Sequence, residues 1–202
     1  GGKSLSVLVP VVAEFLSCRF TGCRFFIVPY AFLKDSLYEA FVQKLSCLGQ
    51  NIKIQSYSAA DIGGDCSSPL PSDLLMQRAP HIAVLTLDAA ANLVQHHTWL
   101  IWSLIRHNNL SRVYFDEIQT FYSEFNFRKV NQTIKQWSQF GVPVSLLSGS
   151  FHPNLIPPTM SSINLNQIKD TSPDDYNVVA SSDMIGDGFD FDVMEATAIS
   201  EV

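Results

Sequence analysis

Residues 113–121 read VYFDEIQTF, and this stretch decides the fold that we predict for the chain. Its apolar and aromatic run, Val113 to Phe115, is followed at once by two carboxylates, Asp116 and Glu117. A short apolar run without polar alternation is typical of a strand that is buried on both faces, as in a parallel sheet. The two acids then either solvate the end of the strand or hold a metal ion and a water molecule at the carboxyl edge of the sheet.

Four more apolar runs share this character, and helical patterns separate them. The runs are 25–29 (FFIVP), 52–57, 82–86 (IAVLT) and 142–147. The helical patterns are Leu5 to Leu16, Leu33 to Leu48, Ala89 to Arg106 and Phe127 to Phe140. Alternation of buried strands with helices implies right-handed crossovers, so we predict an α/β fold with a mostly parallel, doubly wound sheet.

The composition is that of a globular protein with a sizeable core. Of the 202 residues, 47% are hydrophobic and 16% are charged, and the net charge is −6. This balance argues against a strongly basic surface that coats nucleic acid, although a local positive groove is compatible with it. No apolar run reaches the roughly 18 residues of a membrane helix, so we expect no membrane partner. The four cysteines form no CxxC pair, and we predict reduced, mostly buried thiols in an intracellular protein.

The first four residues, GGKS, open the first helical pattern. A glycine-rich turn lets backbone N–H groups close on phosphate oxygens, and the start of a helix adds partial positive charge. A lysine here can reach the β- and γ-phosphates, and the serine after it can ligate Mg²⁺. Alone, these four letters favour an ordinary glycine-rich amino end over a phosphate site. The abrupt start of the chain looks like that of a fragment of a longer product. The order of GGKS, then strands and helices, then Asp116 and Glu117 favours the phosphate site.

Taken in order, these motifs resemble those of a superfamily-two nucleic-acid helicase, of the DEAD/DEAH-box-like group and its RecQ-like branch. The matching segments are GKSL (2–5) for the end of the Walker A motif, FIVPY (26–30) for the segment after the second strand, TLD (86–88) for a TPE-like motif, DEIQ (116–119) for DEAH, EFNFR (124–128) for the stretch after DEAH, and SGS (148–150) for the SAT motif.

The resemblance implies a three-layer RecA-like P-loop NTPase domain over residues 1–165, without its first strand and the start of its P-loop. Residues 166–202 are then a linker and a short remnant of a second RecA-like domain. This remnant is similar to motif V, a match carried by Gly186, Gly188 and Asp190.

The resemblance also implies an ATP-dependent DNA helicase with ATP and Mg²⁺ as cofactors. The nucleotide-binding residues would be Gly1, Gly2, Lys3, Ser4 and Gln119. Ser4 and Asp116 would hold Mg²⁺, and Asp116 and Glu117 would be catalytic, with Glu117 activating water. Ser148 and Ser150 would couple the nucleotide state to DNA contacts.

The expected partner is DNA, single-stranded or duplex with a single-stranded tail, which the intact parent would unwind in the 3′ to 5′ direction. The residues that would touch its backbone are Pro29, Tyr30, Thr86 and Arg128. For Arg128, a solvated helix position is the alternative. We expect the three tryptophans, Trp99, Trp102 and Trp137, to be core or helix-packing residues. The resemblance further implies an intracellular and nuclear protein.

Two rival interpretations remain. One is a catalytically inactive remnant that binds nucleotide or DNA, because nothing that resembles motif VI, with its arginines, follows the motif V-like segment. The other is a different P-loop ATPase or a kinase, which would have a small-molecule substrate and be indifferent to DNA.

Overall fold

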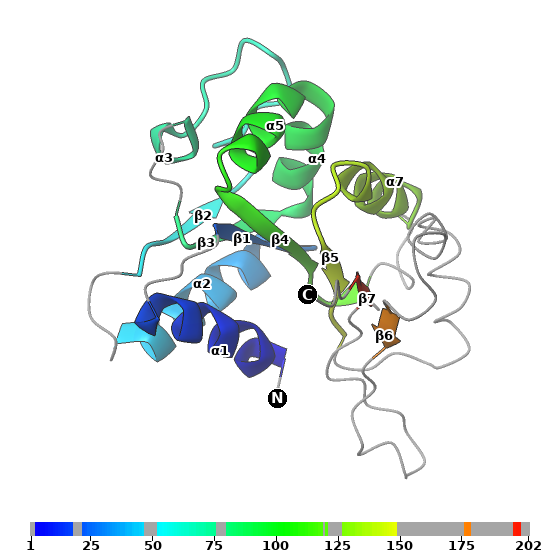
Figure 1. Ribbon diagram of the computed structural model, residues 1–202. Coiled ribbons are helices and arrows are strands. Elements are labelled where there is room, and N and C mark those ends of the chain that lie inside the picture. The colour runs from blue at the N-terminus through cyan, green and yellow to red at the C-terminus, as the bar shows by residue number, and fades with distance from the viewer. Residues whose placement is uncertain are drawn as a thin grey trace.

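The chain is described by a computed structural model that covers residues 3–17, 22–46, 52–75, 80–118, 120, 127–148, 176–178 and 196–198 (Figure 1). Its main feature is a sheet of five parallel strands in the order β2-β3-β1-β4-β5. The strands are β1 (Cys23–Val28), β2 (Ile54–Tyr57), β3 (Ile82–Thr86), β4 (Leu110–Phe115) and β5 (Val144–Leu146). The predicted α/β fold with its parallel sheet is confirmed.

Helices cover both faces of this sheet, which makes three layers (Figure 1). They are α1 (Lys3–Leu16), α2 (Ala31–Leu45), α3 (Ser72–Leu75), α4 (Leu87–His96), α5 (Thr98–Arg106) and α7 (Phe127–Ser138). Helices α1 and α2 lie on one face, and α4, α5 and α7 lie on the other. None of the described helices is long and apolar enough to cross a bilayer.

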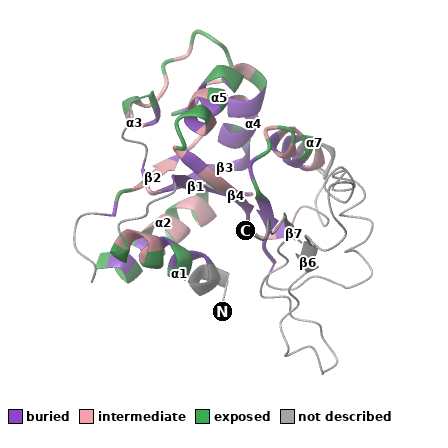
Figure 2. Cartoon of the chain, viewed as in Figure 1, coloured by how far each residue is buried: buried purple, intermediate pink, exposed green. Residues whose placement is uncertain are grey.

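Strand β1 shows why its run of apolar residues has no polar alternation. Phe25 and Ile27 belong to the core cluster under α4, α5 and α7, whereas Phe26 and Val28 belong to the cluster under α1 and α2. Because successive side chains of a strand point to opposite faces, a strand between two helical layers must be apolar at every position. Figure 2 shows the resulting buried centre of the domain.

The registers align the carboxyl ends of the central strands. Val28 of β1 lies beside Thr86 of β3, Ile27 lies beside Phe115 of β4, and Phe115 lies beside Leu146 of β5. Residues that directly follow these strands therefore meet at one edge of the sheet, which we call the carboxyl edge. The opposite edge, where the strands begin, we call the amino edge.

The helix predicted over Ala89 to Arg106 is wrong as one element, because it consists of α4 and α5. His97 separates them with φ −127° and ψ 35°, and its backbone N–H donates to the Leu93 carbonyl at 3.0 Å. The buried His97 side chain has its Nε2 atom 3.2 Å from the Gly63 carbonyl oxygen. Since Gly63 lies in a distant loop, a tertiary contact accompanies the break.

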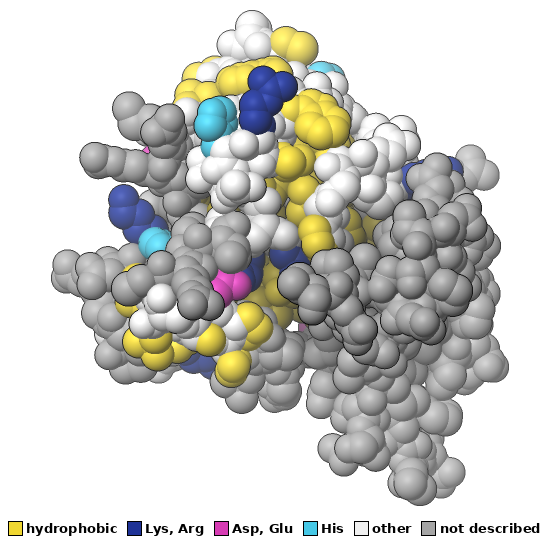
Figure 3. Space-filling model, viewed as in Figure 1, with side chains coloured by type: hydrophobic (Ala, Val, Ile, Leu, Met, Phe, Trp, Pro, Cys, Tyr) yellow, Lys and Arg dark blue, Asp and Glu magenta, His cyan; other side chains and the backbone are white. Residues whose placement is uncertain are grey.

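Two other expectations are only partly met. Trp137 is buried and packs against Phe25, as predicted. Trp102 is 49% exposed but packs against Phe140, which agrees with the predicted helix packing, whereas Trp99 is 55% exposed and is not a core residue. Hydrophobic side chains accordingly show on the surface over α5 (Figure 3). Of the described cysteines, Cys23 is a buried free thiol and Cys66 is an exposed one.

The carboxyl-terminal part of the chain contributes two short strands to the described structure, β6 (Tyr176–Val178) and β7 (Ala196–Ala198), which pair antiparallel. They lie within the segment assigned to a second RecA-like remnant. Its motif V-like residues, Gly186, Gly188 and Asp190, lie outside the described residues, and so do residues 166–175, the first part of the expected linker and remnant.

Candidate nucleotide and nucleic-acid site

The acidic pair lies at the carboxyl edge, held by backbone hydrogen bonds from both sides. The Asp116 N–H donates to the Ile27 carbonyl at 2.9 Å, which ties the pair to β1. The Ile118 N–H donates to the Leu147 carbonyl at 3.0 Å, which ties it to the end of β5. The side chains of Asp116 and Glu117 are half-buried. The sheet therefore fixes the backbone of both acidic residues at its carboxyl edge rather than at a loop tip.

Glu117 has a left-handed backbone conformation, with φ at 56°. This conformation costs a non-glycine residue about 1–2 kcal/mol, because Cβ approaches the carbonyl oxygen. Local bonds stabilise it: the Glu117 N–H donates to Asp116 Oδ1 at 2.9 Å, and the Thr120 hydroxyl donates to the Glu117 carbonyl at 2.7 Å. Strained residues held in this way are concentrated at functional sites. The turn redirects the chain immediately after the two acids.

Ser148, the first residue of the SAT-like motif, lies next to this turn. It is fully buried and directly follows Leu147, whose N–H donates to the Phe115 carbonyl at 2.8 Å. Leu147 thus bonds to the residues on both sides of the acidic pair, Phe115 and Ile118. A displacement of either segment must move the other, which is the geometry that coupling would require. Ser150 lies outside the described residues.

The direction of α1 decides where the GGKS motif lies. The carboxylate of Glu14, near the end of α1, pairs with the guanidinium of Arg24, at the start of β1. The ring of Phe15 packs edge-on against His81, which precedes β3, with centroids 6.0 Å apart. The end of α1 is therefore at the amino edge, and the helix runs antiparallel to the strands, as Figure 1 shows.

The start of α1 consequently lies toward the carboxyl edge. Its 14 residues span ~20 Å, and the six residues of β1 span a similar length. Val7 and Leu8, in its first half, share a core cluster with Val28 and Leu147, which lie at that edge. The structure thus brings the backbone of Lys3 and Ser4 to the same edge as Asp116. Their side chains, and the predicted site residues Gly1, Gly2 and Gln119, lie outside the described part of the chain.

Three of the four predicted DNA-contacting residues are also at this edge. Pro29 and Tyr30 directly follow β1, and Thr86 lies beside Val28 in the register. Thr86 is buried, and its hydroxyl oxygen accepts from the Ala89 N–H at 3.3 Å, so it caps α4. The fourth, Arg128, is in the first turn of α7, and its side chain is not among those described.

The chemistry of the acidic pair fits Mg²⁺. This ion is commonly held by one or two carboxylates together with substrate phosphates and waters, rather than by a cage of protein ligands. Asp116 supplies a carboxylate at the carboxyl edge, and among the described residues no group of three or more His, Cys, Asp or Glu side chains is placed to hold a metal alone. A magnesium ion that arrives with a nucleotide is the kind of metal this edge can bind.

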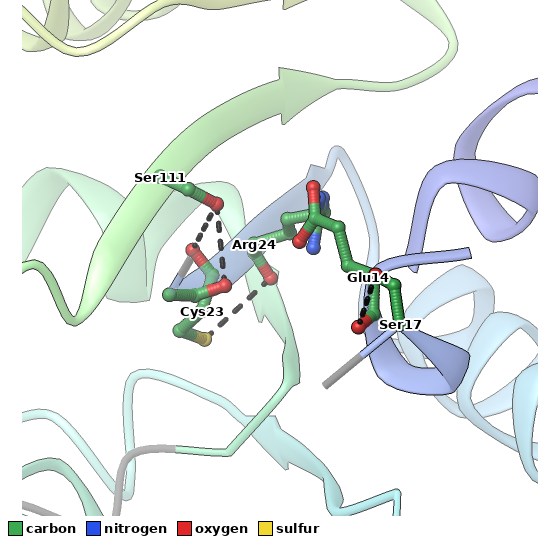
Figure 4. A network of polar contacts seen from close by, with 6 residues as sticks. Glu14, Ser17, Cys23, Arg24 and Ser111 are labelled. Carbon is green, nitrogen blue, oxygen red and sulfur yellow. Dashed lines mark hydrogen bonds and ion pairs between the residues drawn. The ribbon is translucent and has the colours of Figure 1, made fainter. Parts of the chain in front are cut away.

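Sequence reasoning missed a group of charges at the amino edge. Arg24 is only 4% exposed and pairs with Glu14, and the Ser17 hydroxyl in turn donates to the Glu14 carbonyl (Figure 4). On the neighbouring strand, Arg112 donates to the Ser145 hydroxyl at 3.3 Å. Burial lowers the pKa of Arg112 from its ordinary value. The spacing of residue types in the sequence does not predict such a network, because the network depends on which face of each strand packs against α1.

Sequence reasoning also missed Phe32. This residue, near the start of α2, is 67% exposed, and its ring stacks on Tyr30 with centroids 5.5 Å apart and planes 11° from parallel. The available signal was an aromatic residue two positions after Tyr30. Phe32 lies one residue before the helical pattern predicted over Leu33 to Leu48, so the sequence analysis made no prediction for it.

The fold is similar to that of the DUF1998 helicase MrfA, in a crystal structure bound to DNA and in another bound to DNA and AMPPNP. For each, the TM-score is 0.56 at 19% sequence identity, over 79% of this chain and 22% of the helicase. The chain thus spans about a fifth of the helicase's length. The likeness confirms the predicted RecA-like α/β domain. No protein-family model and no curated protein sequence matches the chain significantly.

Proposed function

We propose that the chain is the ATP-binding domain of a DNA helicase of superfamily two, of the RecQ-like branch. The proposal rests on one observation. Two carboxylates, Asp116 and Glu117, are fixed by backbone bonds at the centre of the carboxyl edge, and the helix that begins with Lys3 and Ser4 starts at this edge. The MrfA helicase, whose fold is similar, binds DNA and AMPPNP in its crystals, which supports both ligands.

Each residue of the proposed site has a role that follows from its chemical type. Lys3, with the backbone of Gly1 and Gly2, binds the phosphates, and Gln119 adds a hydrogen bond from the acidic motif. Ser4 and Asp116 hold the metal ion, which neutralises charge on the phosphate oxygens when it is bound. Glu117 accepts the proton of the attacking water, for which its carboxylate must be ionised.

The serines and the first DNA contacts complete the proposal. Ser148 and Ser150 couple hydrolysis to DNA contacts, because Leu147 joins the acidic turn to the end of β5. Pro29, Tyr30, Thr86 and Arg128 contact the backbone of DNA, which positions the strand without reading its sequence. The Thr86 hydroxyl oxygen caps α4 as an acceptor, and its O–H can donate to a phosphate oxygen.

The test is ATP hydrolysis by the full chain, with and without single-stranded DNA. Glu117→Gln is expected to lower hydrolysis by about 10²-fold or more while nucleotide binding is kept, because a general base is removed and the metal ligand is not. Glu39→Gln, an exposed position on α2, is the matched control and should leave the rate unchanged.

Each rival interpretation has its own outcome in this test. ATP binding without hydrolysis by the unaltered chain would identify an inactive remnant. Hydrolysis that ignores DNA would identify another P-loop ATPase or a kinase. The RecQ-like branch and its 3′ to 5′ direction are tested with tailed duplexes, where a duplex with a 3′ tail should be unwound and one with a 5′ tail should not.

A further inference from the structure

Two aromatic side chains lie parallel at the start of α2. Tyr30 is the N-cap residue of this helix, and Phe32 is its second residue. Their ring centroids are 5.5 Å apart and their planes differ by 11°, which is the offset-stacked arrangement that aromatic pairs prefer. Phe32 is 67% exposed although it is one of the largest apolar side chains of the protein. A flat apolar surface of one ring is therefore presented to solvent.

The pair lies at the carboxyl edge. Tyr30 comes two residues after Val28, and Val28 lies beside Thr86 in the register of β1 and β3. The stacked rings thus lie at the same edge of the sheet as Pro29 and Thr86, two of the residues proposed to contact DNA. An exposed ring at this place is in reach of any strand that those residues hold.

The surroundings of Phe32 suit a ring-sized ligand rather than a protein. The helix surface that follows it is polar: Lys34 pairs with Asp35 at 2.8 Å, and Asp35, Ser36 and Glu39 are exposed. A protein partner normally covers a continuous apolar patch. Such a patch exists elsewhere, on α5, where the exposed Trp99 and Trp102 lie three residues apart and Trp102 packs on Phe140.

The start of α2 is also compatible with a phosphate beside the rings. The Tyr30 side chain makes no capping hydrogen bond, and the first turn contains no acidic residue. The N–H groups of a first turn have no partner within the helix and favour negative charge. A nucleotide contains both parts, a flat base and a phosphate.

We propose that Phe32, supported by Tyr30, is a stacking platform for one base of single-stranded nucleic acid. The base extends the stack to three rings, Tyr30, Phe32 and the base. Stacking of this kind tolerates any base, because every base has an aromatic face. The inference deepens the proposed function and rests on it, since it gives the DNA-contacting edge its first base contact.

The test measures the affinity of the full chain for a fluorescent dT oligonucleotide at fixed salt, with an abasic oligonucleotide of equal length as the second probe. Phe32→Ala and Phe32→Leu should each weaken dT binding by about 5- to 150-fold, because both remove the aromatic face. Phe32→Trp should restore binding, and the added tryptophan emission should be quenched by dT. Neither Ala nor Leu should weaken binding of the abasic strand.

Trp99→Ala is the matched control, because it removes an exposed aromatic side chain of similar accessibility from α5. It should leave both affinities unchanged. Since Phe32 and Trp99 are both largely exposed, circular dichroism should show that the variants keep their fold.

The failures of the two proposals are distinguishable. If the unaltered chain binds dT and Phe32→Ala or Phe32→Leu binds it equally well, the platform is wrong and the DNA-binding function stands. If Trp99→Ala weakens binding as much as Phe32→Ala, the stacking surface is not at the carboxyl edge. If the unaltered chain binds neither oligonucleotide, with or without Mg²⁺ and AMPPNP, the proposed function falls together with the platform.

Discussion

The two edges of the parallel sheet hold their charged residues in different ways. At the amino edge, Arg24 is almost fully buried and its partner is another side chain, Glu14 of α1. At the carboxyl edge, Asp116 and Glu117 are half-buried, and backbone bonds from the neighbouring strands hold the turn that contains them. Figure 3 shows acidic side chains (magenta) next to basic ones (dark blue) on the surface between α1 and α5.

The difference separates charges that hold the fold together from charges that the fold presents. A buried side-chain pair stabilises the packing of α1 only while both partners are present, because either one alone is a buried uncompensated charge. At position 116 a side-chain oxygen accepts from the Glu117 N–H, so an amide can replace the carboxylate there without loss of the turn. The strained φ of Glu117 points the same way, since strain is retained where a conformation is needed for something other than stability.

Of the substitutions that test this comparison, Arg24→Met is expected to change the stability most. It should lower the free energy of unfolding by about 3–5 kcal/mol, because Glu14 is left partly buried without its cationic partner. Urea denaturation measures the loss, and Arg24→Met with Glu14→Leu should recover much of it. Asp116→Asn is the control at the other edge: the amide oxygen can still accept from the Glu117 N–H, so a loss above ~1 kcal/mol would contradict the distinction.

Gly22→Ala tests the close packing of the amino edge. Gly22 has a φ of 120°, and an added Cβ would lie 2.6 Å from the backbone oxygen of Asn108. Strain and the clash together should cost about 3 kcal/mol, measured as a lower denaturation midpoint in urea. Gly141→Ala is the matched control, because φ is 72° there and no atom lies within 4 Å of the added Cβ. Equal losses in the two variants would mean that the contact with Asn108 contributes nothing.

Glu117→Gly should have the opposite sign at the carboxyl edge. Removal of Cβ relieves the left-handed strain, so the free energy of unfolding should rise by about 1 kcal/mol while ATP hydrolysis is lost. Asn108→Gly is the control, because Asn108 has a φ of 55° but asparagine tolerates this conformation better. A Glu117→Gly variant that is less stable than the unaltered chain would show that the glutamate is there for the fold.

His81 gives the smallest effect, a pH dependence at the amino edge. Burial, then the charges of Lys53 and Arg24, lower its pKa below 6.5, and its Nδ1 atom accepts from the Lys53 N–H at 3.0 Å. The unfolded chain therefore takes up this proton first as the pH falls through 6.5, so stability is complete above that pH and is lost below it. His81→Asn, which keeps an acceptor, should show a smaller loss of unfolding free energy between pH 7.5 and 5.5. An identical loss in both proteins would assign the dependence to other groups.

The fold could be predicted from the sequence because each central strand must be apolar on both faces. This requirement marks 82–86 as a strand with the same bounds as β3, and places Asp116 directly after β4. GGKS, the acidic pair and SGS could be recognised as motifs from their order along the chain alone. These are local signals, and the structure places the backbone of Lys3 and Ser4, the acidic pair and Ser148 at one edge.

The remainder depends on contacts between distant segments, for which no local signal exists. The break at His97 accompanies its contact with Gly63, and the pair of Arg24 with Glu14 requires α1 to lie across the start of β1. The left-handed φ of Glu117 could not be predicted from the sequence, because glutamate, unlike glycine or asparagine, has no preference for that conformation. Exposure of Phe32 depends on how α2 is rotated against the sheet, which the spacing of its apolar residues does not settle.

The central claim is that the first residues of α1 and the acidic pair hold one metal-bound triphosphate between them. The direct measurement is a double-mutant cycle on the affinity for AMPPNP with Mg²⁺, by titration calorimetry of the full chain, Lys3→Ala, Asp116→Asn and the double variant. Each single change should weaken binding by about 10-fold or more, and the double variant should lose clearly less than the sum, because both residues act on one ligand. Independent, additive losses, or binding that neither change affects, would contradict the claim.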